Sequence, residues 1–328
     1  MKIEVNTHER CMIEFAAKHP EVVVMSADLG SSCEVKKFRS VYPDRYFTMG
    51  IAEQNMCSWA AGLAREGYRP FLHTFSVFLY RRILDQLEMS VAYPNLPVVF
   101  VGFVPGITTP GGVSHQSIND VGVLRTVPNM TIFDIGDATE IEGALDLAYD
   151  RNGPVYIRML RKEVPRLFPA EEPMQFGHAR TLSEGEDILI LSSSICTEEA
   201  IRATGALKEC GVSVQHMHVS TLKPFDDPQI LEALKKCRSG VVTIENHYEI
   251  GGLGSAVAEM IAEHGLSRRL IRIGLPGYTH GASKMYLMKK YGIDAMHLVH
   301  AVEELTGKDL PVTQELLLEE RFVDYLEV

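Results

Sequence analysis

Short apolar runs alternate with helix-like stretches through the first half of the chain. These runs lack the strict polar alternation of a strand with one face in water, and they occupy 22–25, 45–49, 71–74, 97–103, 130–133 and 155–157. A helix-like stretch runs from about Ala52 to Gly67, a residue type that commonly ends helices. Asn6 and Glu9 have the spacing of a capping box ahead of an earlier helix. This alternation predicts a parallel sheet with helices on both faces.

The alternation stops between 164 and 187 and then resumes. The interruption contains Pro165, Pro169 and Pro173 together with several charges, and we interpret it as a linker. Beyond it, strands are predicted at 188–191, 212–218, 241–244 and 270–273, and helices at 198–209, 228–237 and 253–264. The predicted fold class is α/β with two doubly wound domains: 1–165, a linker at 166–186, and a smaller domain with a mostly parallel sheet at 187–328.

Composition and charge exclude several classes of protein. The chain has 328 residues, which suggests two domains, and a formal net charge of −11 without a dense Lys/Arg cluster, so nucleic acid is a poor partner. No apolar run approaches the ~18 residues of a membrane span, and the N-terminus lacks the apolar core of a signal peptide. The six cysteines form no C-x-x-C pair. We therefore expect reduced thiols and a cytoplasmic location.

The most informative segment is MGIAEQNM, at 49–56, where a strand end leads into a helix that starts near Glu53. A glutamate in the first turn of a helix is favoured by the helix dipole and needs no further explanation. The alternative is a buried carboxylate at the carboxyl edge of the sheet, where open α/β sheets bind ligands. Burial would raise the pKa of such a carboxylate and let it share a proton with a ring nitrogen.

Three further segments offer candidate site residues. In HTFSVFLYRRILDQ, Phe75 and Phe78 are three residues apart, which fits core packing or a wall for a flat heteroaromatic ring. In PGITTPGGVSHQ, His115 ends a Gly/Pro-rich loop, where it is either a solvated side chain or a donor to a carbonyl or oxyanion. In GPVYIRMLRKEVP, Arg158 and Arg161 are either solvated cations or an anion site. The glycines of GGLGSA lack the G-x-G-x-x-G spacing, so a tight turn explains them.

Four of these segments, in this order, resemble the pyrimidine-binding domain of the transketolase family. IAEQNM resembles the family's Glu motif, TFSVF its aromatic pocket, GGVSHQSINDVGVLRTVPNM its His loop and following helix, and GPVYIRMLR its arginine strand. SADLGSS, at 26–32, resembles the segment near the cofactor's thiazolium ring. The second domain, with GGLGSAVAEM, resembles the family's C-terminal domain. The resemblance spans essentially the whole chain and implies the C-terminal subunit of a split transketolase.

The resemblance implies thiamine diphosphate as the cofactor and a role for each candidate residue. Glu53 should hydrogen-bond N1′ of the aminopyrimidine, so that the cofactor removes its own thiazolium proton while the protein supplies position and electrostatics. The other implied contacts are Phe75 and Phe78 for the aminopyrimidine, Asp28 and Leu29 for the thiazolium, His115 for the reacting substrate oxygen, and Arg161 with Ser32 for the substrate's distal anion.

The resemblance also implies a missing half of the site. In the family, a separate domain holds the diphosphate and its metal through a GDG motif followed by an Asn, and full-length transketolase is roughly twice this length. No GDG occurs in this sequence. Because a diphosphate is too highly charged to remain unpaired in a buried site, we expect an N-terminal subunit to carry that motif with Mg²⁺ or Ca²⁺. The implied assembly is a homodimer core within a 2:2 heterotetramer, active only when complete.

Several positions that would contact the substrate depart from the family pattern. The family loop before the His is typically G-[ED]-D-G, and Gly111 stands where its Asp reads a substrate hydroxyl. A family His falls on Phe103, and an N-terminal Arg falls near Asn6, with His8 and Arg10 close by. Losing such a hydrogen bond shifts substrate preference. We therefore expect transfer of a two-carbon ketol unit from a ketose to an aldose, with a sugar or sugar phosphate that is not the standard one.

Three alternatives remain open at this stage. The beta subunit of a 2-oxoacid dehydrogenase has similar length and domains, although the HQ loop and VLRTVPNM favour transketolase. A relative of 1-deoxyxylulose-5-phosphate synthase fits FLYRRILDQ and the spacing of His115, Gln116 and Asp120, but that enzyme normally carries both halves in one chain. A catalytically degenerate regulatory subunit is disfavoured because Glu53, Phe75, Phe78 and His115 are retained together.

Overall fold

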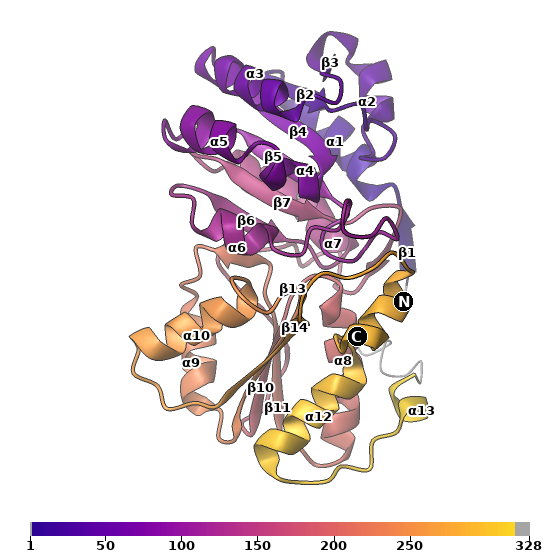
Figure 1. Ribbon diagram of the computed structural model, residues 1–328, viewed down its shortest axis with the longest axis vertical. Helices are drawn as coiled ribbons and strands as arrows, with labels where there is room; N and C mark the ends of the chain where they lie inside the picture. Colours follow the sequence, from indigo (N-terminus) through magenta and orange to yellow (C-terminus); the bar gives the residue numbers. More distant parts are fainter. Residues whose placement is uncertain (1, 319–328) are drawn as a thin grey trace.

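A computed structural model describes residues 2–318 and contains two α/β units, one stacked on the other (Figure 1). The first unit is built on a seven-stranded sheet in the order β12-β6-β7-β5-β4-β2-β3, in which only β12 is antiparallel. Its strands are β2 (Val22–Ser26), β3 (Tyr46–Thr48), β4 (Arg69–Phe75), β5 (Val99–Phe103), β6 (Thr131–Asp134), β7 (Val155–Met159) and β12 (Thr221–Lys223). The sequence therefore predicted the parallel sheet correctly.

Helices cover both faces of the first sheet because its strands carry apolar side chains on both sides. Within β4, Phe71 packs toward α1 and α7, whereas Leu72 packs toward α3 and η2. One face holds α1 (Thr7–Lys18), α2 (Lys36–Val41), the short η1 (Pro43–Arg45) and α7 (Ala138–Tyr149). The other holds α3 (Glu53–Arg65), α4 (Ser76–Arg81), α5 (Leu84–Gln86), the π-helix η2 (Leu87–Ala92) and α6 (Asp120–Arg125). This is the doubly wound arrangement.

The second unit has a five-stranded sheet in the order β14-β13-β10-β11-β9, with β9 antiparallel. Its strands are β9 (Arg180–Ser183), β10 (Ile188–Ser192), β11 (Val214–His218), β13 (Gly240–Tyr248) and β14 (Leu270–Leu275). Its helices are α8 (Cys196–Glu209), α9 (Pro228–Lys236), α10 (Leu253–Glu263), α11 (Lys284–Tyr291), α12 (Ala295–Thr306) and α13 (Gln314–Leu317). No helix within residues 2–318 combines the length and apolar character needed to cross a bilayer.

One strand, β12, and one apolar cluster connect the two units. β12 follows the second unit's β11 along the chain but pairs with β6 of the first sheet, and one apolar cluster runs from Ile132 to Leu189 and Leu191. A two-stranded ribbon, β1 (Lys2–Val5) with β8 (Glu163–Arg166), flanks the junction. β9 lies within the segment 166–186, and β12 pairs with the sheet of the other unit, so the two units are not separated by a simple cut in the chain. The domain boundaries drawn from the sequence stay a prediction.

The prediction of a capping box at the start of α1 was wrong. Asn6 has a left-handed backbone, with φ 53°, and its side chain caps no backbone N–H. An N-cap residue normally has an extended backbone, from which its side chain can reach back to the helix. Glu9 instead accepts a hydrogen bond from the Lys37 backbone N–H at 2.9 Å, which ties α1 to α2.

Candidate active site

The carboxyl ends of five parallel strands place the predicted site residues along one edge of the first sheet. β2, β3, β4, β5 and β7 are all mutually parallel, and the register sets Phe75 beside Phe103 and Phe103 beside Met159. Each candidate therefore lies at the end of one of these strands, in the loop that follows it, or in the first turn of the next helix. The residues in order along the chain are Asp28, Leu29, Ser32, Glu53, Phe75, Phe78, His115 and Arg161.

Glu53 is the first residue of α3 and only 3% exposed. The short connection from β3 brings it directly to the sheet edge, and the helix N-terminus favours its negative charge. Its carboxylate Oε1 accepts a hydrogen bond from Nη1 of Arg82 at 2.6 Å. Glu53 is therefore a buried carboxylate at the carboxyl edge of the sheet, as the second interpretation of this motif requires; a role in binding a ligand stays a prediction.

Arg82 joins Glu53 to the aromatic part of the site, and sequence reasoning missed it. Its guanidinium carbon lies 3.8 Å from the centre of the Phe78 ring, while the same group pairs with Glu53. The side chain remains 41% exposed, so it is free to move into solvent. The signal in the sequence was the second arginine of YRR, four residues after Phe78 and thus one helical turn away.

Phe75, Phe78 and His115 form an aromatic cluster. Phe75 ends β4 and Phe78 lies in α4, and their ring centres are 6.0 Å apart at an interplanar angle of 25°. The His115 ring meets both edge-on, at 6.1 Å from Phe75 and 5.8 Å from Phe78. On the other side, the guanidinium carbon of Arg161 lies 5.2 Å from the Phe75 ring centre. Both phenylalanines are only partly buried, so their rings still offer surface to a ligand.

His115 is held at one ring nitrogen only. Its Nδ1 is 2.9 Å from the Ser114 hydroxyl, and Arg81 fixes the same loop by donating to the Val113 carbonyl at 2.9 Å. Nε2 of His115 has no hydrogen-bond partner anywhere in the described residues 2–318. This nitrogen is available to a ligand at the sheet edge.

The segment after β2 contacts the cluster through Arg161. Nη1 of Arg161 donates to the backbone carbonyl of Ser32 at 2.9 Å, so the two implied anion-binding residues are adjacent. Asp28 is exposed with a left-handed backbone, φ 61°, and the Leu29 N–H donates to the Ser26 hydroxyl at 3.2 Å. Within residues 2–318 no hydrogen bond joins Asp28 or Leu29 to the aromatic cluster, so these two share only its edge of the sheet.

Arg158 is neither a solvated cation nor an anion site, so both sequence interpretations of it were wrong. It is completely buried, with Nε 2.9 Å from Asp120 Oδ2 and Nη1 3.0 Å from Asp134 Oδ1. Burial alone would lower the pKa of Arg158, but these two carboxylates raise it above its usual value. All five residues of β7 are buried because helices cover both faces of the sheet, and Arg158 is one of them, whereas Arg161 lies beyond the strand end.

Two buried histidines lie beside Phe103, where the family pattern predicted a histidine. Nε2 of His8 and Nε2 of His73 are 3.0 Å apart, and the His8 ring lies edge-on to Phe103 at 5.3 Å. Burial lowers the pKa of His73 to about 4 and holds that of His8 well below its usual range, with His73 adding to the effect. Both imidazoles are therefore neutral near pH 7. No periodic pattern in the sequence predicts that these two histidines meet.

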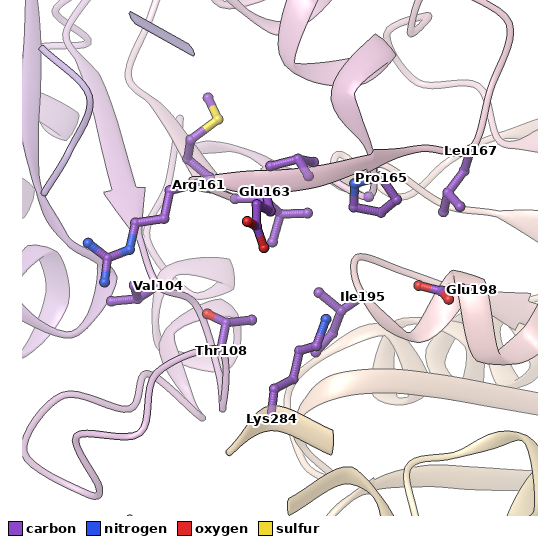
Figure 2. A pocket seen from close by; sticks show the side chains of 13 residues that line it. Val104, Thr108, Arg161, Glu163, Pro165, Leu167, Ile195, Glu198 and Lys284 are labelled. Atoms are coloured by element: carbon purple, nitrogen blue, oxygen red, sulfur yellow. The ribbon is translucent and has the colours of Figure 1, made fainter. Parts of the chain in front are cut away.

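A cavity of about 220 Å³ adjoins the site at the junction of the two units (Figure 2). Arg161 forms part of its wall, and Glu163 and Lys284 project into it from the first and second units. Its charges are mixed in sign, so the cavity itself selects no ligand class. No group of three or more His, Cys, Asp or Glu side chains suited to a metal ion occurs in the described part of the chain.

Comparison with known proteins identifies the family of both units. Residues 5–166 match the family model of the transketolase pyrimidine-binding domain, and residues 177–298 match that of the transketolase C-terminal domain. A solved structure described as a split gene transketolase, inactive beta4 tetramer, has a TM-score of 0.85 and 35% identity, covering 93% of this chain and 98% of that one.

Curated relatives include both half-length and full-length proteins. The 6-deoxy-6-sulfo-D-fructose transketolase subunit SqwH of Clostridium sp. (strain MSTE9) is 38% identical over 92% of this chain and 94% of that protein. A putative transketolase C-terminal section from Methanocaldococcus jannaschii is 37% identical, and the match covers 91% of this chain and 94% of that protein. The 1-deoxy-D-xylulose-5-phosphate synthase of Methylacidiphilum infernorum is 36% identical, but the match spans 45% of that protein. The chain belongs to the transketolase family, in which it corresponds to the pyrimidine-binding and C-terminal domains.

Proposed function

We propose that this chain is the C-terminal subunit of a transketolase that moves a two-carbon ketol unit from a ketose to an aldose, and that it works only with a separate N-terminal subunit. The observation that carries the proposal is the buried Glu53 carboxylate linked through Arg82 to the Phe78 ring. A site built from a carboxylate and an aromatic face is suited to a flat, nitrogen-bearing ring.

The chemistry of these side chains fits the aminopyrimidine of thiamine diphosphate. The planar guanidinium of Arg82 already makes both contacts that this ring needs, a hydrogen bond to Glu53 and stacking on Phe78. A planar group with N–H donors is therefore accommodated between them. Because Arg82 is 41% exposed, it can turn into solvent when the cofactor ring takes its place.

Each candidate residue then has one task. When bound, thiamine diphosphate supplies a reactive thiazolium carbon, while Glu53 holds the proton at the aminopyrimidine N1′. Phe75 and Phe78 orient that ring, and Asp28 and Leu29 border the thiazolium. His115 donates from Nε2 to the substrate oxygen that gains charge, because its Nδ1 is already held by Ser114. Arg161, beside Ser32, binds the distal anion of the substrate.

The diphosphate and a Mg²⁺ or Ca²⁺ ion are assigned to the partner subunit. Half-length relatives support this division, since one is named a transketolase subunit and another a C-terminal section. We propose a homodimer core in a 2:2 heterotetramer, with the GDG motif on the partner. We also keep the division of the chain at 1–165, 166–186 and 187–328 as a proposal.

The substrate is proposed to be a sugar with an anionic end other than the standard phosphate. The SqwH relative is named for a sulfonated fructose, which shows that a half-length family member acts on such a sugar. Three departures in this chain, at Gly111, Phe103 and Asn6, support a changed substrate end. A complex that used ordinary pentose phosphates at full transketolase efficiency would contradict this part of the proposal.

The function is tested by reconstituting the chain with a GDG-bearing subunit and measuring ketol transfer. Glu53→Ala should lower turnover by a factor of ~10²–10⁴, as expected for loss of a group that positions a proton, while the mass of the complex stays unchanged. Glu66→Ala, at the exposed far end of α3, is the matched control and should leave turnover intact. If the Glu53→Ala complex assembled and turned over at the wild-type rate, Glu53 would not activate the cofactor.

A further inference from the structure

The loop that carries His115 is held by Arg81 of the first unit and, at both ends and in its middle, by the second unit. Ile107 and Ile118, at its two ends, belong to the apolar core of that unit. At the start of the loop, the Asn246 side chain accepts from the Ile107 N–H at 3.0 Å and donates to the Pro105 carbonyl at 3.1 Å. At its end, the Tyr248 N–H donates to the Ile118 carbonyl at 2.6 Å. Both ends of the loop are thus hydrogen-bonded to β13.

The middle of the loop is fixed by a buried amide next to His115. Gln116 is 1% exposed, and its Oε1 accepts a short hydrogen bond from the hydroxyl of Thr279, which is 3% exposed. Its Nε2 donates to the carbonyls of His280 and Thr109, each at 3.3 Å. Every donor and the acceptor of this amide are therefore used, and two of the three partners come from the segment between β14 and α11.

The two segments also touch backbone to backbone. A Cβ placed on Gly281 would lie 2.7 Å from the Pro110 carbonyl oxygen, and one on Gly112 would lie 3.3 Å from the Gly281 nitrogen. Such close approach leaves little room for the loop to shift while the second unit stays in place. The hydrogen bonds of the Gln116 side chain and the contact of Gly281 with Pro110 and Gly112 therefore both hold the segment on either side of His115.

We propose that the C-terminal domain sets the position of His115, and that Thr279 is a positioning residue for the reaction although it lies in that domain. This rests on the proposed function, in which His115 contacts the substrate oxygen. Removing the Thr279 hydroxyl leaves the buried Oε1 of Gln116 without a partner, so the amide must move or rotate. Since His115 is the adjacent residue, its imidazole moves with it.

The test uses Thr279→Val and Thr279→Ser in the reconstituted complex. Thr279→Val should lower kcat by ~10- to 100-fold, the size of effect that a displaced catalytic group can produce, while the Kd for thiamine diphosphate stays unchanged. Thr279→Ser keeps the hydroxyl and should restore kcat. In the free chain, labelled with ¹³C-histidine, Thr279→Val should shift the His115 imidazole signal, which is assigned by its loss in His115→Ala.

The decisive comparison is a double-mutant cycle. If Thr279 acts through His115, then Thr279→Val should have no further effect on the residual activity of His115→Ala. Thr243→Val is the matched control, because its hydroxyl is buried in the same unit and has no hydrogen-bond partner among residues 2–318, and it should leave both kcat and the His115 signal unchanged.

Two results would overturn the proposal: an equal loss from Thr279→Val in the presence and absence of His115, or wild-type kcat with an unshifted His115 signal. A wild-type complex without ketol transfer would instead count against the proposed function, so the two failures are distinct.

Discussion

At the scale of single residues, Gly111 shows how the site differs from the family pattern. A Cβ at this position would lie 2.9 Å from the Cβ of His115 and 3.0 Å from its Cγ, although the residue itself is exposed. Real Cβ atoms do not tolerate such distances, so any side chain at 111 must displace His115 or the loop. The absent Asp is therefore coupled to the observed position of His115.

We predict that Gly111→Ala lowers turnover by ~10-fold or more, because in the proposed function a displaced imidazole no longer reaches the substrate oxygen. The midpoint of thermal unfolding should change little, since the new methyl group lies at the surface. Gly277→Ala provides the control, because a Cβ there has no atom of the described part of the chain within 4 Å. Steady-state kinetics of the complex measure this effect. Wild-type turnover in Gly111→Ala would show that the loop accommodates the new Cβ without displacing His115.

His247 makes the chain sensitive to acid at the contact between the units. Its Nε2 accepts the Gly122 N–H at 3.2 Å, and its Nδ1 donates to the Tyr248 carbonyl at 2.6 Å, so the ring must be neutral. Burial lowers the pKa of His247 to about 4. Below pH ~6.5 the unfolded chain binds a proton that the folded chain excludes, so stability is complete above pH ~6.5 and falls as the pH drops toward 4.

We predict that this histidine accounts for about 3 kcal/mol of the free energy of unfolding lost between pH 6.5 and pH 4. His247→Asn removes the titrating group and should flatten that part of the curve by about this amount, whatever its effect at pH 7. His264→Asn, at an exposed position just after α10, should leave the slope unchanged. Urea unfolding at half-unit pH steps measures both slopes, and parallel curves for the wild type and His247→Asn would refute the prediction.

At the scale of secondary structure, the sequence predicted the ten strands that form the body of both sheets. Most of those strands are buried, and continuous apolar runs mark them directly, although β3 and the first half of β14 are partly exposed. The apolar pattern did not predict β1, β8, β9 and β12, which are only three or four residues long and lack a continuous apolar run, so their pairing depends on the rest of the fold. The candidate residues of the site follow strand ends and could be listed in advance. Arg82 and Thr279 could not, because tertiary contacts alone bring them to Glu53 and Gln116.

Arg158 connects three elements of the first unit, since it lies on β7 and pairs with Asp120 of α6 and Asp134 of β6. Arg158→Met would leave two carboxylates buried without a counterion, so we predict a loss of about 3–5 kcal/mol in the free energy of unfolding. The matched change at an exposed pair is Arg238→Met, opposite Glu186, which should cost less than ~1 kcal/mol. Chemical denaturation of both variants gives the comparison, and equal losses would contradict this account of the buried triad.

At the scale of the whole molecule, the first unit exposes apolar side chains near Glu53. Ile51 precedes α3, Trp59 lies on α3, and Met89 and Tyr93 lie on or just after the adjacent η2; their exposed fractions are 76%, 54%, 60% and 81%. Aromatic residues and methionine are enriched where proteins bind one another. A subunit that brings a diphosphate site to Glu53 must cover Ile51, two residues away, and so should cover this surface.

Trp59 is the only tryptophan of the chain and reports on that contact directly. With 5-fluorotryptophan in this chain alone, adding the N-terminal subunit should shift the ¹⁹F signal of Trp59 and remove its solvent isotope effect, because the ring leaves water. A chain with Trp59→Phe and His264→Trp carries the label beyond α10 of the second unit, and its signal should not change. If a complex of the expected mass formed while the Trp59 signal stayed that of the free chain, the partner would dock elsewhere, and Glu53 could not share a cofactor with it.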